Sequence, residues 1–469
     1  MPDYSLLIDG QLIETERSFP VVNPATEEVI AACPLAEEAD LDVAVKAARK
    51  AQLLWAATPY AKRQETLVAI ADVIKDHKEE LAKLLVQEQG KPLFDALAEI
   101  SGAEYYTRYY ASLELPVRVV EDNERQRVEE HRKPLGVVAG IVPWNYPFMI
   151  AVYKLAPAIL AGNAFILKPA PTTSLTALRF GALIQGVVPK GVVQILSDNN
   201  NLGPLITSHA EIAKISFTGS TATGKAIMRS GADTLKRLTL ELGGNDAAIV
   251  LADVDLDVVA PRLYAFAFSN AGQVCVAIKR LYVHDDIYDD VCARLAALAE
   301  KVTVGDGMQD GVRMGPLQNK MQFEKVLSLI DAVKKGEGDI LTGGERLGEK
   351  GYFIKPTIVS NVREGSPLVD EEAFGPVLPV IRYTDIEDVI ERANTSSYGL
   401  GASVWSSDTQ RATEIARRLD SGTVWVNQHM ILGPNIPLRG AKQSGVGVEN
   451  AVEGFYEYTS PQIINIAKV

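Results

Sequence analysis

The stretch Ala213-Lys-Ile-Ser-Phe-Thr-Gly-Ser-Thr-Ala-Thr-Gly-Lys225 joins an apolar strand to the first turn of a helix through a short glycine-containing turn. Strands and helices alternate in this way from residue 136 to residue 241, with strands expected at 136–142, 164–168, 192–196, 213–217 and 237–241. The alternation predicts an α/β fold in which helices cover a parallel sheet. A second series, with strands expected near 247–251, 281–283, 377–383 and 423–427, predicts a further unit of the same kind.

The flanking segments show other patterns. Residues 6–26 predict short strands and turns, and residues 38–112 have the apolar spacing of helices. Residues 117–133 are charged and partly alternating, which predicts an exposed β-ribbon arm. The tail contains Ile463-Ile-Asn-Ile466, a short strand with no following helix. A ribbon and a terminal strand can both extend a sheet, so both are candidates for contacts between subunits.

Composition limits the class of protein. The chain has 469 residues, which predicts two or three domains, and its net charge of −13 argues against nucleic acid or an anionic membrane as partner. The three cysteines, Cys33, Cys275 and Cys292, fit neither a disulfide framework nor a zinc site, and we expect no metal. The N-terminus lacks the pattern of a secretory signal, and polar residues interrupt the most apolar segment, 151–167. We therefore expect a cytoplasmic protein without a membrane span.

Two residues are candidates for catalysis. Cys275 ends the segment Phe268-Ser-Asn-Ala-Gly-Gln-Val-Cys275, whose polar residues favour a reactive thiol over a small buried hydrophobe. Glu241 ends an apolar strand and precedes Leu242-Gly-Gly244. Apolar neighbours raise the pKa of a carboxyl, as a general base near neutral pH requires, although helix capping or an ion pair would also explain this glutamate. Together the two residues predict covalent catalysis followed by hydrolysis.

The turn at Gly219–Thr221 predicts an anion site. Its N–H groups and the positive end of the helix dipole suit a pyrophosphate. The segment also matches the beginning of a P-loop, but Ala226 stands where that motif needs Ser or Thr to hold Mg²⁺. A dinucleotide is therefore favoured. Lys168, at the carboxyl end of an apolar strand, is a candidate for binding ribose hydroxyls or a phosphate, and a solvated strand-end lysine is the alternative.

The loop Pro143-Trp-Asn-Tyr-Pro-Phe148 follows a strand and leads into a helix, for which Pro147 suits the first turn. In so rigid a loop, the Asn145 amide is a candidate donor to a developing oxyanion. The alternative is that the Asn145 side chain caps the following helix.

Taken together, these motifs resemble the aldehyde dehydrogenase superfamily. The similar segments, in family order, are Ile8-Asp-Gly10, Asn23-Pro-Ala-Thr26, Gly90-Lys-Pro92, Pro143-Trp-Asn145, Phe217-Thr-Gly-Ser220, Glu241-Leu-Gly-Gly244, Cys275, Glu372-Ala-Phe-Gly-Pro376 and Lys442-Gln-Ser-Gly445. The resemblance implies two Rossmann-like three-layer αβα domains and a β-ribbon arm that forms homodimers or homotetramers. The dinucleotide-binding domain would comprise residues 1–115 and 135–241, the catalytic domain 242–452, and the arm 116–134 with 453–469.

The resemblance also implies oxidation of an aldehyde to the carboxylate with NAD or NADP. The Cys275 thiolate would attack the aldehyde, the Asn145 amide and the Cys275 backbone N–H would stabilise the oxyanion, and hydride transfer would leave a thioester. Glu241 would then activate water, with Lys154 and Glu449 as a proton relay behind it. Relatives that pass the acyl group to coenzyme A generally lack this glutamate, so hydrolysis is expected.

The remaining site residues are implied in the same way. The cofactor would contact Ile141, Pro143, Trp144, Lys168, Gly203, Phe217, Gly219, Ser220, Leu242, Glu372 and Phe374. The aldehyde tunnel would be lined by Tyr146, Met149, Ile150, Tyr153, Val274, Val276, Leu432 and Leu438. This lining is mainly apolar, which favours an aromatic or medium-chain aliphatic aldehyde.

Three positions depart from the family pattern. Ala170-Pro171 stands where many NAD-dependent members have Ser-Glu, so a carboxylate that holds the adenosine ribose is missing. Its loss also removes repulsion of a 2′-phosphate, which predicts that NADP is accepted at least alongside NAD. Pro437-Leu-Arg-Gly440 replaces Pro-Phe-Gly-Gly, and Val448 stands where an arginine is common. The Arg439 cation leaves open a carboxylate-bearing semialdehyde as substrate.

Two other classes of protein are alternatives. A phosphate-binding NTPase would use the segment Gly219–Lys225 and would hydrolyse ATP with Mg²⁺. A non-catalytic, crystallin-like binding protein would keep the scaffold and form no NADH or NADPH with any aldehyde. The set of Cys275, Glu241 and Asn145 argues against both.

Overall fold

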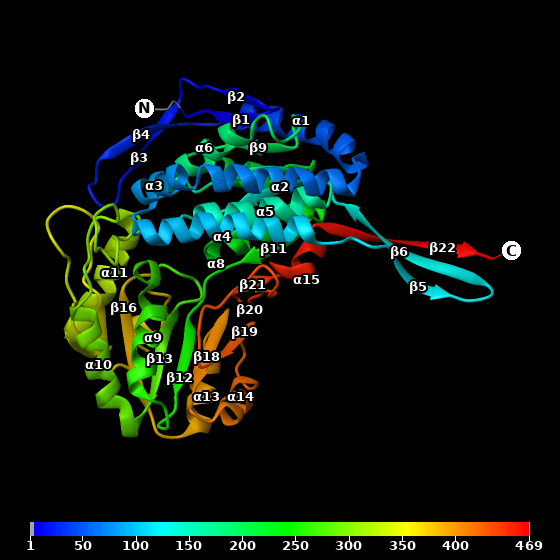
Figure 1. Ribbon diagram of the computed structural model, residues 1–469. Coiled ribbons are helices and arrows are strands. Elements are labelled where there is room, and N and C mark those ends of the chain that lie inside the picture. The colour runs from blue at the N-terminus through cyan, green and yellow to red at the C-terminus, as the bar shows by residue number, and fades with distance from the viewer. Residues whose placement is uncertain (1–3, 469) are drawn as a thin grey trace.

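The computed structural model describes residues 4–468, which form two large sheets, their covering helices and a long arm (Figure 1). The first sheet has eight strands in the order β2-β1-β9-β8-β7-β10-β11-β21. Its parallel centre comprises β9 (Val193–Ile195), β8 (Ala164–Lys168), β7 (Val137–Ile141), β10 (Ile212–Thr218) and β11 (Arg237–Glu241). The antiparallel strands are β1 (Leu6–Ile8), β2 (Gln11–Ile13) and β21 (Gly445–Val446). All five parallel strands were predicted.

The second sheet has seven strands in the order β14-β15-β16-β13-β12-β18-β19. Its parallel strands are β15 (Thr357–Ser360), β16 (Val377–Tyr383), β13 (Ile278–His284), β12 (Asp246–Val250), β18 (Gly401–Trp405) and β19 (Thr423–Val426), and β14 (Asp339–Thr342) is the antiparallel edge. β14, β15 and β18 were not predicted from the sequence. In β18, the weak strand formers Gly401, Ala402 and Ser403 obscure the pattern, and pairing with β12 and β19 forms the strand instead.

Helices cover the first sheet. Those that pack on its strands are α1 (Glu38–Ala57), α5 (Pro147–Leu160), α6 (Leu175–Ile184), α7 (Leu202–Ser208) and α8 (Thr221–Gly231). An outer layer of α2 (Tyr60–Asp76), α3 (Lys78–Gln89) and α4 (Leu93–Ser112) packs on α5 and α6. Their apolar residues and those of the sheet form one core. Within residues 4–468, we find no helix with both the length and the apolar character needed to cross a bilayer.

The second sheet separates two apolar clusters, as its alternating side chains require. Ile249 packs in the cluster that includes α11 (Lys320–Ala332), α13 (Ile386–Asn394) and α14 (Thr409–Ala416). Val250 packs in the other cluster, with α9 (Leu256–Phe268) and α10 (Tyr288–Glu300). The predicted α/β class, with two Rossmann-like helix-covered sheets, is confirmed. The domain limits remain a prediction, and residues 1–3 and 469 within those limits lie outside the described range.

Smaller elements complete the fold. They are β3 (Ser18–Val22), β4 (Val29–Pro34), β17 (Tyr398–Gly399), β20 (Ala441–Lys442), α12 (Pro367–Asp370) and α15 (Ala451–Tyr456). Within the short strands and turns predicted for residues 6–26, Asp9-Gly10 joins β1 to β2 as a hairpin, and both residues have the positive φ (49° and 70°) that a tight turn requires.

The arm projects from the body as a three-stranded sheet in the order β22-β6-β5 (Figure 1). β5 (Arg118–Asp122) and β6 (Gln126–Pro134) form the predicted ribbon, and β22 (Thr459–Ala467) pairs with β6 along its whole length. The predicted tail strand therefore pairs with a strand of its own chain. Among the described residues, the outer edges of β22 and β5 have no strand partner.

Asn163 ties the root of the arm to the core. Its buried side-chain oxygen accepts the N–H groups of Leu135 and Gly136 at 2.6 and 2.9 Å. Its amide donates to the carbonyls of Ala158 and Tyr458 at 3.0 and 2.9 Å. One side chain thus connects the end of β6, α5 and the tail.

The substitution Asn163→Ala should remove these bonds and leave buried backbone groups without partners. We expect the free energy of unfolding to fall by roughly 3 kcal/mol, measured by urea unfolding followed by circular dichroism. Asn465→Ala, at an exposed position of β22, should change it by less than about 0.5 kcal/mol. Equal losses in the two variants would contradict this role for Asn163.

Candidate active site

The two large sheets are joined by the short connector between β11 and β12, and the predicted catalytic residues lie around it. Glu241 is the last residue of β11, and Cys275 precedes β13 in the second sheet. A Cβ on Gly244 would lie 2.3 Å from the Cys275 carbonyl oxygen, and one on Gly243 would lie 2.6 Å from a carboxylate oxygen of Glu372. Only glycine at position 244 therefore lets the connector approach the cysteine loop this closely, and glycine at position 243 leaves room for Glu372.

The half-buried Cys275 follows an irregular turn, η3 (Ser269–Gly272). Asn270 and Ala271 adopt left-handed conformations, with φ of 49° and 55°, which cost energy for residues with a Cβ. Hydrogen bonds hold the turn: Gln89 donates to the Asn270 side chain at 3.2 Å, and Asn270 donates to the Asn145 carbonyl at 3.0 Å. The cysteine loop is thus fixed to the loop that contains Asn145.

The Asn145 side chain is buried and donates one N–H to the Gln273 carbonyl at 2.9 Å. It does not cap α5, because the Glu99 carboxylate accepts the N–H groups of Phe148 and Met149 at 3.0 and 3.2 Å. The capping alternative for Asn145 is therefore wrong. Since an amide nitrogen carries two hydrogens, one N–H remains to be offered to a ligand.

A buried ion pair, Lys91 with Glu99, contacts the loop that contains Asn145. The Lys91 ammonium lies 2.5 Å from the Glu99 carboxylate and donates to the Asn145 carbonyl at 2.9 Å. It also lies 3.7 Å from the centre of the Tyr146 ring. A buried pair is stable only when its other bonding groups are satisfied, as they are here. Neither Lys91 nor Glu99 was assigned a role from the sequence. The signal that could have pointed to Lys91 was the motif Gly90-Lys-Pro92.

Glu241 is almost fully buried, with 3% of its surface exposed, and among the described residues one of its carboxylate oxygens has no hydrogen-bond partner. Burial, and then the charge of Glu449, raise the pKa of Glu241 well above its usual value, while Lys154 opposes the shift. Lys154 and Glu449, for which the resemblance predicted a proton relay, form a buried ion pair, and the Ser216 hydroxyl lies 3.0 Å from both. Tyr458 donates to Ser216 at 3.1 Å. Ser216 and Tyr458 were not predicted.

Burial also changes the pKa of the Cys275 thiol. Burial raises the pKa of Cys275 to about 12, with smaller contributions from Glu372 and Glu241. Burial also raises the pKa of Glu372 to about 7, although Lys279 opposes this shift. In this state the thiol is therefore protonated near neutral pH, and a base or a nearby positive charge is needed to form the thiolate.

A cavity of about 820 Å³ lies at the carboxyl ends of the first sheet's strands. Most of the predicted cofactor residues line it, namely Ile141, Pro143, Trp144, Lys168, Gly203, Phe217, Gly219 and Ser220. Three others do not. Leu242 packs under Gly224, Glu372 accepts the Gly244 N–H at 3.2 Å, and Phe374 meets the edge of Trp144 with ring centres 5.3 Å apart.

The residues around this cavity fit a dinucleotide. At the start of α8, the Glu241 carbonyl accepts the Gly219 N–H and the Ser220 side chain accepts the Thr223 N–H, which leaves the N–H groups between them for an anion. The volume is in the range of cofactor sites. Sequence reasoning missed the slot between α7 and α8, lined by Pro204, Thr207, Ile227 and Ser230, because nothing in the local pattern marks it. Lys225 donates to the Gln443 side chain at 2.7 Å. In a P-loop the lysine would instead reach the bound phosphates, so this contact argues against the P-loop alternative.

The predicted tunnel residues fall into separate groups. Val274 and Val276 pack in one apolar cluster with Tyr146 and Leu432, and Cys275 lies against it. The α5 residues Met149, Ile150 and Tyr153 belong to the core of the first sheet. Leu438 is buried and exchanges backbone hydrogen bonds of 2.8 Å with Glu449, whereas Arg439 is exposed.

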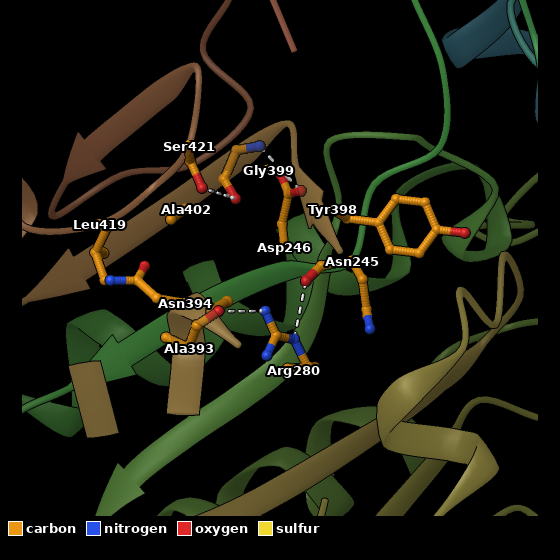
Figure 2. Close-up of a pocket in the computed structure, with 12 residues that line it drawn as sticks. Asn245, Asp246, Arg280, Ala393, Asn394, Tyr398, Gly399, Ala402, Leu419 and Ser421 are labelled. Carbon is orange, nitrogen blue, oxygen red and sulfur yellow. Dashed lines mark hydrogen bonds between the residues drawn. The ribbon is translucent and has the colours of Figure 1, made fainter. Parts of the chain in front are cut away.

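A second pocket lies between β12, β18 and the end of α13 (Figure 2). Its volume is about 10 Å³, room for one water molecule at most. Arg280 donates to the carbonyls of Asn245 and Ala393 at 2.9 and 3.0 Å, and the Gly401 N–H donates to Asp246 at 3.0 Å. The pocket is too small for a substrate, and its bonds anchor the connector after Glu241 to the second sheet.

Comparison with known proteins gives full-length similarity. The chain matches the model of the aldehyde dehydrogenase family over residues 12–464. It is 43% identical over 467 residues to a probable aldehyde dehydrogenase of Pseudomonas sp, covering 99% of this chain and 94% of that one. It is 38% identical over 482 residues to the phenylacetaldehyde dehydrogenase of Pseudomonas fluorescens, covering 99% and 96%.

Solved structures agree. The NAD⁺ complex of an aldehyde dehydrogenase from Bacillus cereus has a TM-score of 0.97 at 38% identity, covering 100% of this chain and 97% of that one. An NADP-dependent enzyme of E. coli has a TM-score of 0.96 at 33% identity, covering 99% and 98%.

The raised pKa of Cys275 predicts slow alkylation of the free protein. Below its pKa, the thiolate fraction rises about tenfold per pH unit, so the rate with iodoacetamide should rise steadily from pH 6.5 to 9.5. The rate is followed by mass spectrometry of the Cys275 peptide, and Cys275→Ser, which keeps the buried Cys33 and Cys292, serves as control. A plateau near pH 7 would show that the thiol is already ionised.

Proposed function

The chain belongs to the aldehyde dehydrogenase family, and from this premise we propose that it oxidises an aromatic or medium-chain aliphatic aldehyde through a thioester on Cys275. The resemblance drawn from the motifs and the predicted enzyme class, an NAD- or NADP-dependent aldehyde dehydrogenase, are confirmed by this membership. The observation that carries the mechanism is the meeting of Cys275, Asn145 and Glu241 around one connector, beside a cavity of dinucleotide size.

The proposed reaction begins when the Cys275 thiol loses its proton to water, which the positive charge of a bound oxidised nicotinamide would favour, and the resulting thiolate attacks the aldehyde carbon. The free N–H of Asn145 and the Cys275 backbone N–H receive the charge on the oxygen of the thiohemiacetal. When bound, NAD or NADP supplies the hydride acceptor, and a thioester remains on the sulfur. Glu241, whose raised pKa suits a general base, takes a proton from the water that attacks the thioester. Lys154 and Glu449 carry that proton away from the buried site.

The cofactor is NAD or NADP, since solved relatives of the same fold use each of them. Gly219 and Ser220 would hold the pyrophosphate at the first turn of α8, and Lys168 would face the adenosine ribose. Trp144, with Phe374 against its edge, would flank the nicotinamide end.

For the substrate, an aromatic aldehyde is supported by the relative that acts on phenylacetaldehyde and by the apolar cluster against Cys275. The semialdehyde alternative requires Arg439 to face the substrate. Arg439 is exposed, as expected of a surface cation.

We further propose that the arm joins subunits into a homodimer or homotetramer in the cytoplasm. The arm exposes apolar side chains at Val119, Val120, Ile463, Ile464 and Ile466. An exposed apolar strand edge of this kind favours pairing with another chain.

Two variants separate the chemical steps. Cys275→Ser should lower aldehyde oxidation at least about 10³-fold, because a serine at this position has no base to activate it comparably. Glu241→Gln should still form one equivalent of reduced cofactor in a burst, and then turn over at least about 10²-fold more slowly because hydrolysis fails. Both are read by absorbance of NADH or NADPH. Oxidation by Cys275→Ser at the parental rate would overturn the mechanism.

An aldehyde panel tests the substrate. We expect a higher kcat/KM for phenylacetaldehyde and hexanal than for succinic semialdehyde. Arg439→Ala should change kcat/KM for the semialdehyde less than about twofold, because the exposed guanidinium is screened by water. A selective loss of semialdehyde oxidation in this variant would instead support the carboxylate-bearing substrate.

A further inference from the structure

Lys168 is held by a buried carboxylate that the sequence pattern did not reveal. Its ammonium lies 2.6 Å from Asp198, and the two side chains are 6% and 0% exposed. The second oxygen of Asp198 accepts the N–H of Leu202, the first residue of α7, at 2.8 Å. Asp198 therefore forms an ion pair with Lys168 through one oxygen and accepts a hydrogen bond from the start of α7 with the other.

The ion pair lies at the part of the cavity that would receive the adenosine ribose. The first turn of α8, at Gly219 and Ser220, suits the pyrophosphate. Pro204 of α7 and Ile227 of α8 line a slot suited to a flat base. A ribose that links base to phosphate must then lie between them, at the carboxyl end of β8, where Lys168 ends the strand.

The net charge around the ribose position affects whether the site prefers the 2′-hydroxyl of NAD or the 2′-phosphate of NADP. The cavity-lining residues include two lysines, Lys168 and Lys320, and no carboxylate. Lys320 is exposed and lies 3.9 Å from Glu324, so water screens it. Lys168 is buried and its charge is matched by Asp198. Its remaining N–H donors can serve ribose hydroxyls, but the pair as a whole offers no net positive charge to a 2′-phosphate.

We propose that Asp198 is a specificity-determining residue that makes this site favour NAD over NADP. It neutralises Lys168 and holds its ammonium in place for the ribose hydroxyls. The inference rests on the proposed function, because it assumes that a dinucleotide occupies this cavity. The inference also refines the prediction, drawn from Ala170-Pro171, that NADP is accepted alongside NAD. NADP would still bind because the usual glutamate is missing, but the negative charge of Asp198 would make NADP the weaker cofactor.

The variant Asp198→Asn separates charge from structure. An asparagine oxygen can still accept the Leu202 N–H, so the start of α7 keeps its bond while the Lys168 charge is released. Glu324→Gln is the matched control, because it removes a carboxylate beside the other lysine of the cavity at an exposed position. Asp198→Ala, which loses both the charge and the bond to Leu202, shows the effect of structural damage.

Binding is measured by calorimetry with two fragments, adenosine 2′,5′-bisphosphate and 5′-AMP, and turnover with both dinucleotides. In Asp198→Asn, we expect the bisphosphate to bind about tenfold more tightly and 5′-AMP to change less than about threefold. The ratio of kcat/KM for NADP to that for NAD should rise by a similar factor, and this gain should shrink in high salt. Glu324→Gln should shift the ratio less than about twofold.

Three results would overturn the inference: no gain for the bisphosphate in Asp198→Asn, an equal change for both fragments, or the same gain in Glu324→Gln. These failures differ from failure of the proposed function. If the parent binds 5′-AMP and reduces a dinucleotide with an aldehyde, the function stands whatever Asp198 does. If it does neither, the proposed function itself is lost.

Discussion

The site depends on one close approach, between the backbone that leaves the first sheet and the backbone that carries the thiol. Gly244 permits it, because a Cβ there would lie 2.3 Å from the Cys275 carbonyl oxygen. Gly243 leaves room for Glu372, whose carboxylate would lie 2.6 Å from a Cβ at that position. The connector therefore holds Glu241, at the end of β11, against the cysteine loop. A displacement of about 1 Å can lower a catalysed rate by orders of magnitude, so the missing side chain at Gly244 would help to set the geometry of the proposed reaction.

Around this contact, several charged and polar side chains are buried, and their burial affects both the stability of the fold and the pKa values of the site. Burial is the main reason that the pKa values of the thiol and the nearby carboxyls are raised. The ions that remain buried occur in pairs, each with a further hydrogen bond or neighbouring hydroxyl: Lys91 with Glu99, Lys154 with Glu449, and Lys168 with Asp198. Such pairs add little net stability, but removing one partner is costly, so they keep loops and helices in fixed positions.

Each buried pair serves a different part of the proposed reaction. The first positions the loop that contains Asn145, the second lies near Glu241, and the third lies where the ribose of the cofactor would bind. All three lie in or beside the first sheet, whereas the thiol comes from the second. In the proposed reaction, the first sheet would therefore hold the buried charges and the cofactor, and the second would present the nucleophile.

The sequence by itself determined what depends on neighbours along the chain. The alternation of apolar strands and helices predicted the parallel sheets, and the local frames of Cys275 and Glu241 identified the catalytic candidates. Short or weakly patterned strands such as β18 were missed, because pairing with neighbouring strands forms them. The partners of the buried charges were decided only by tertiary structure: Lys154 and Glu449 are 295 residues apart, and nothing in the pattern around Lys168 points to Asp198. The physical reason is that a charge is paired by what folding brings within a few ångströms, and no local pattern records that distance.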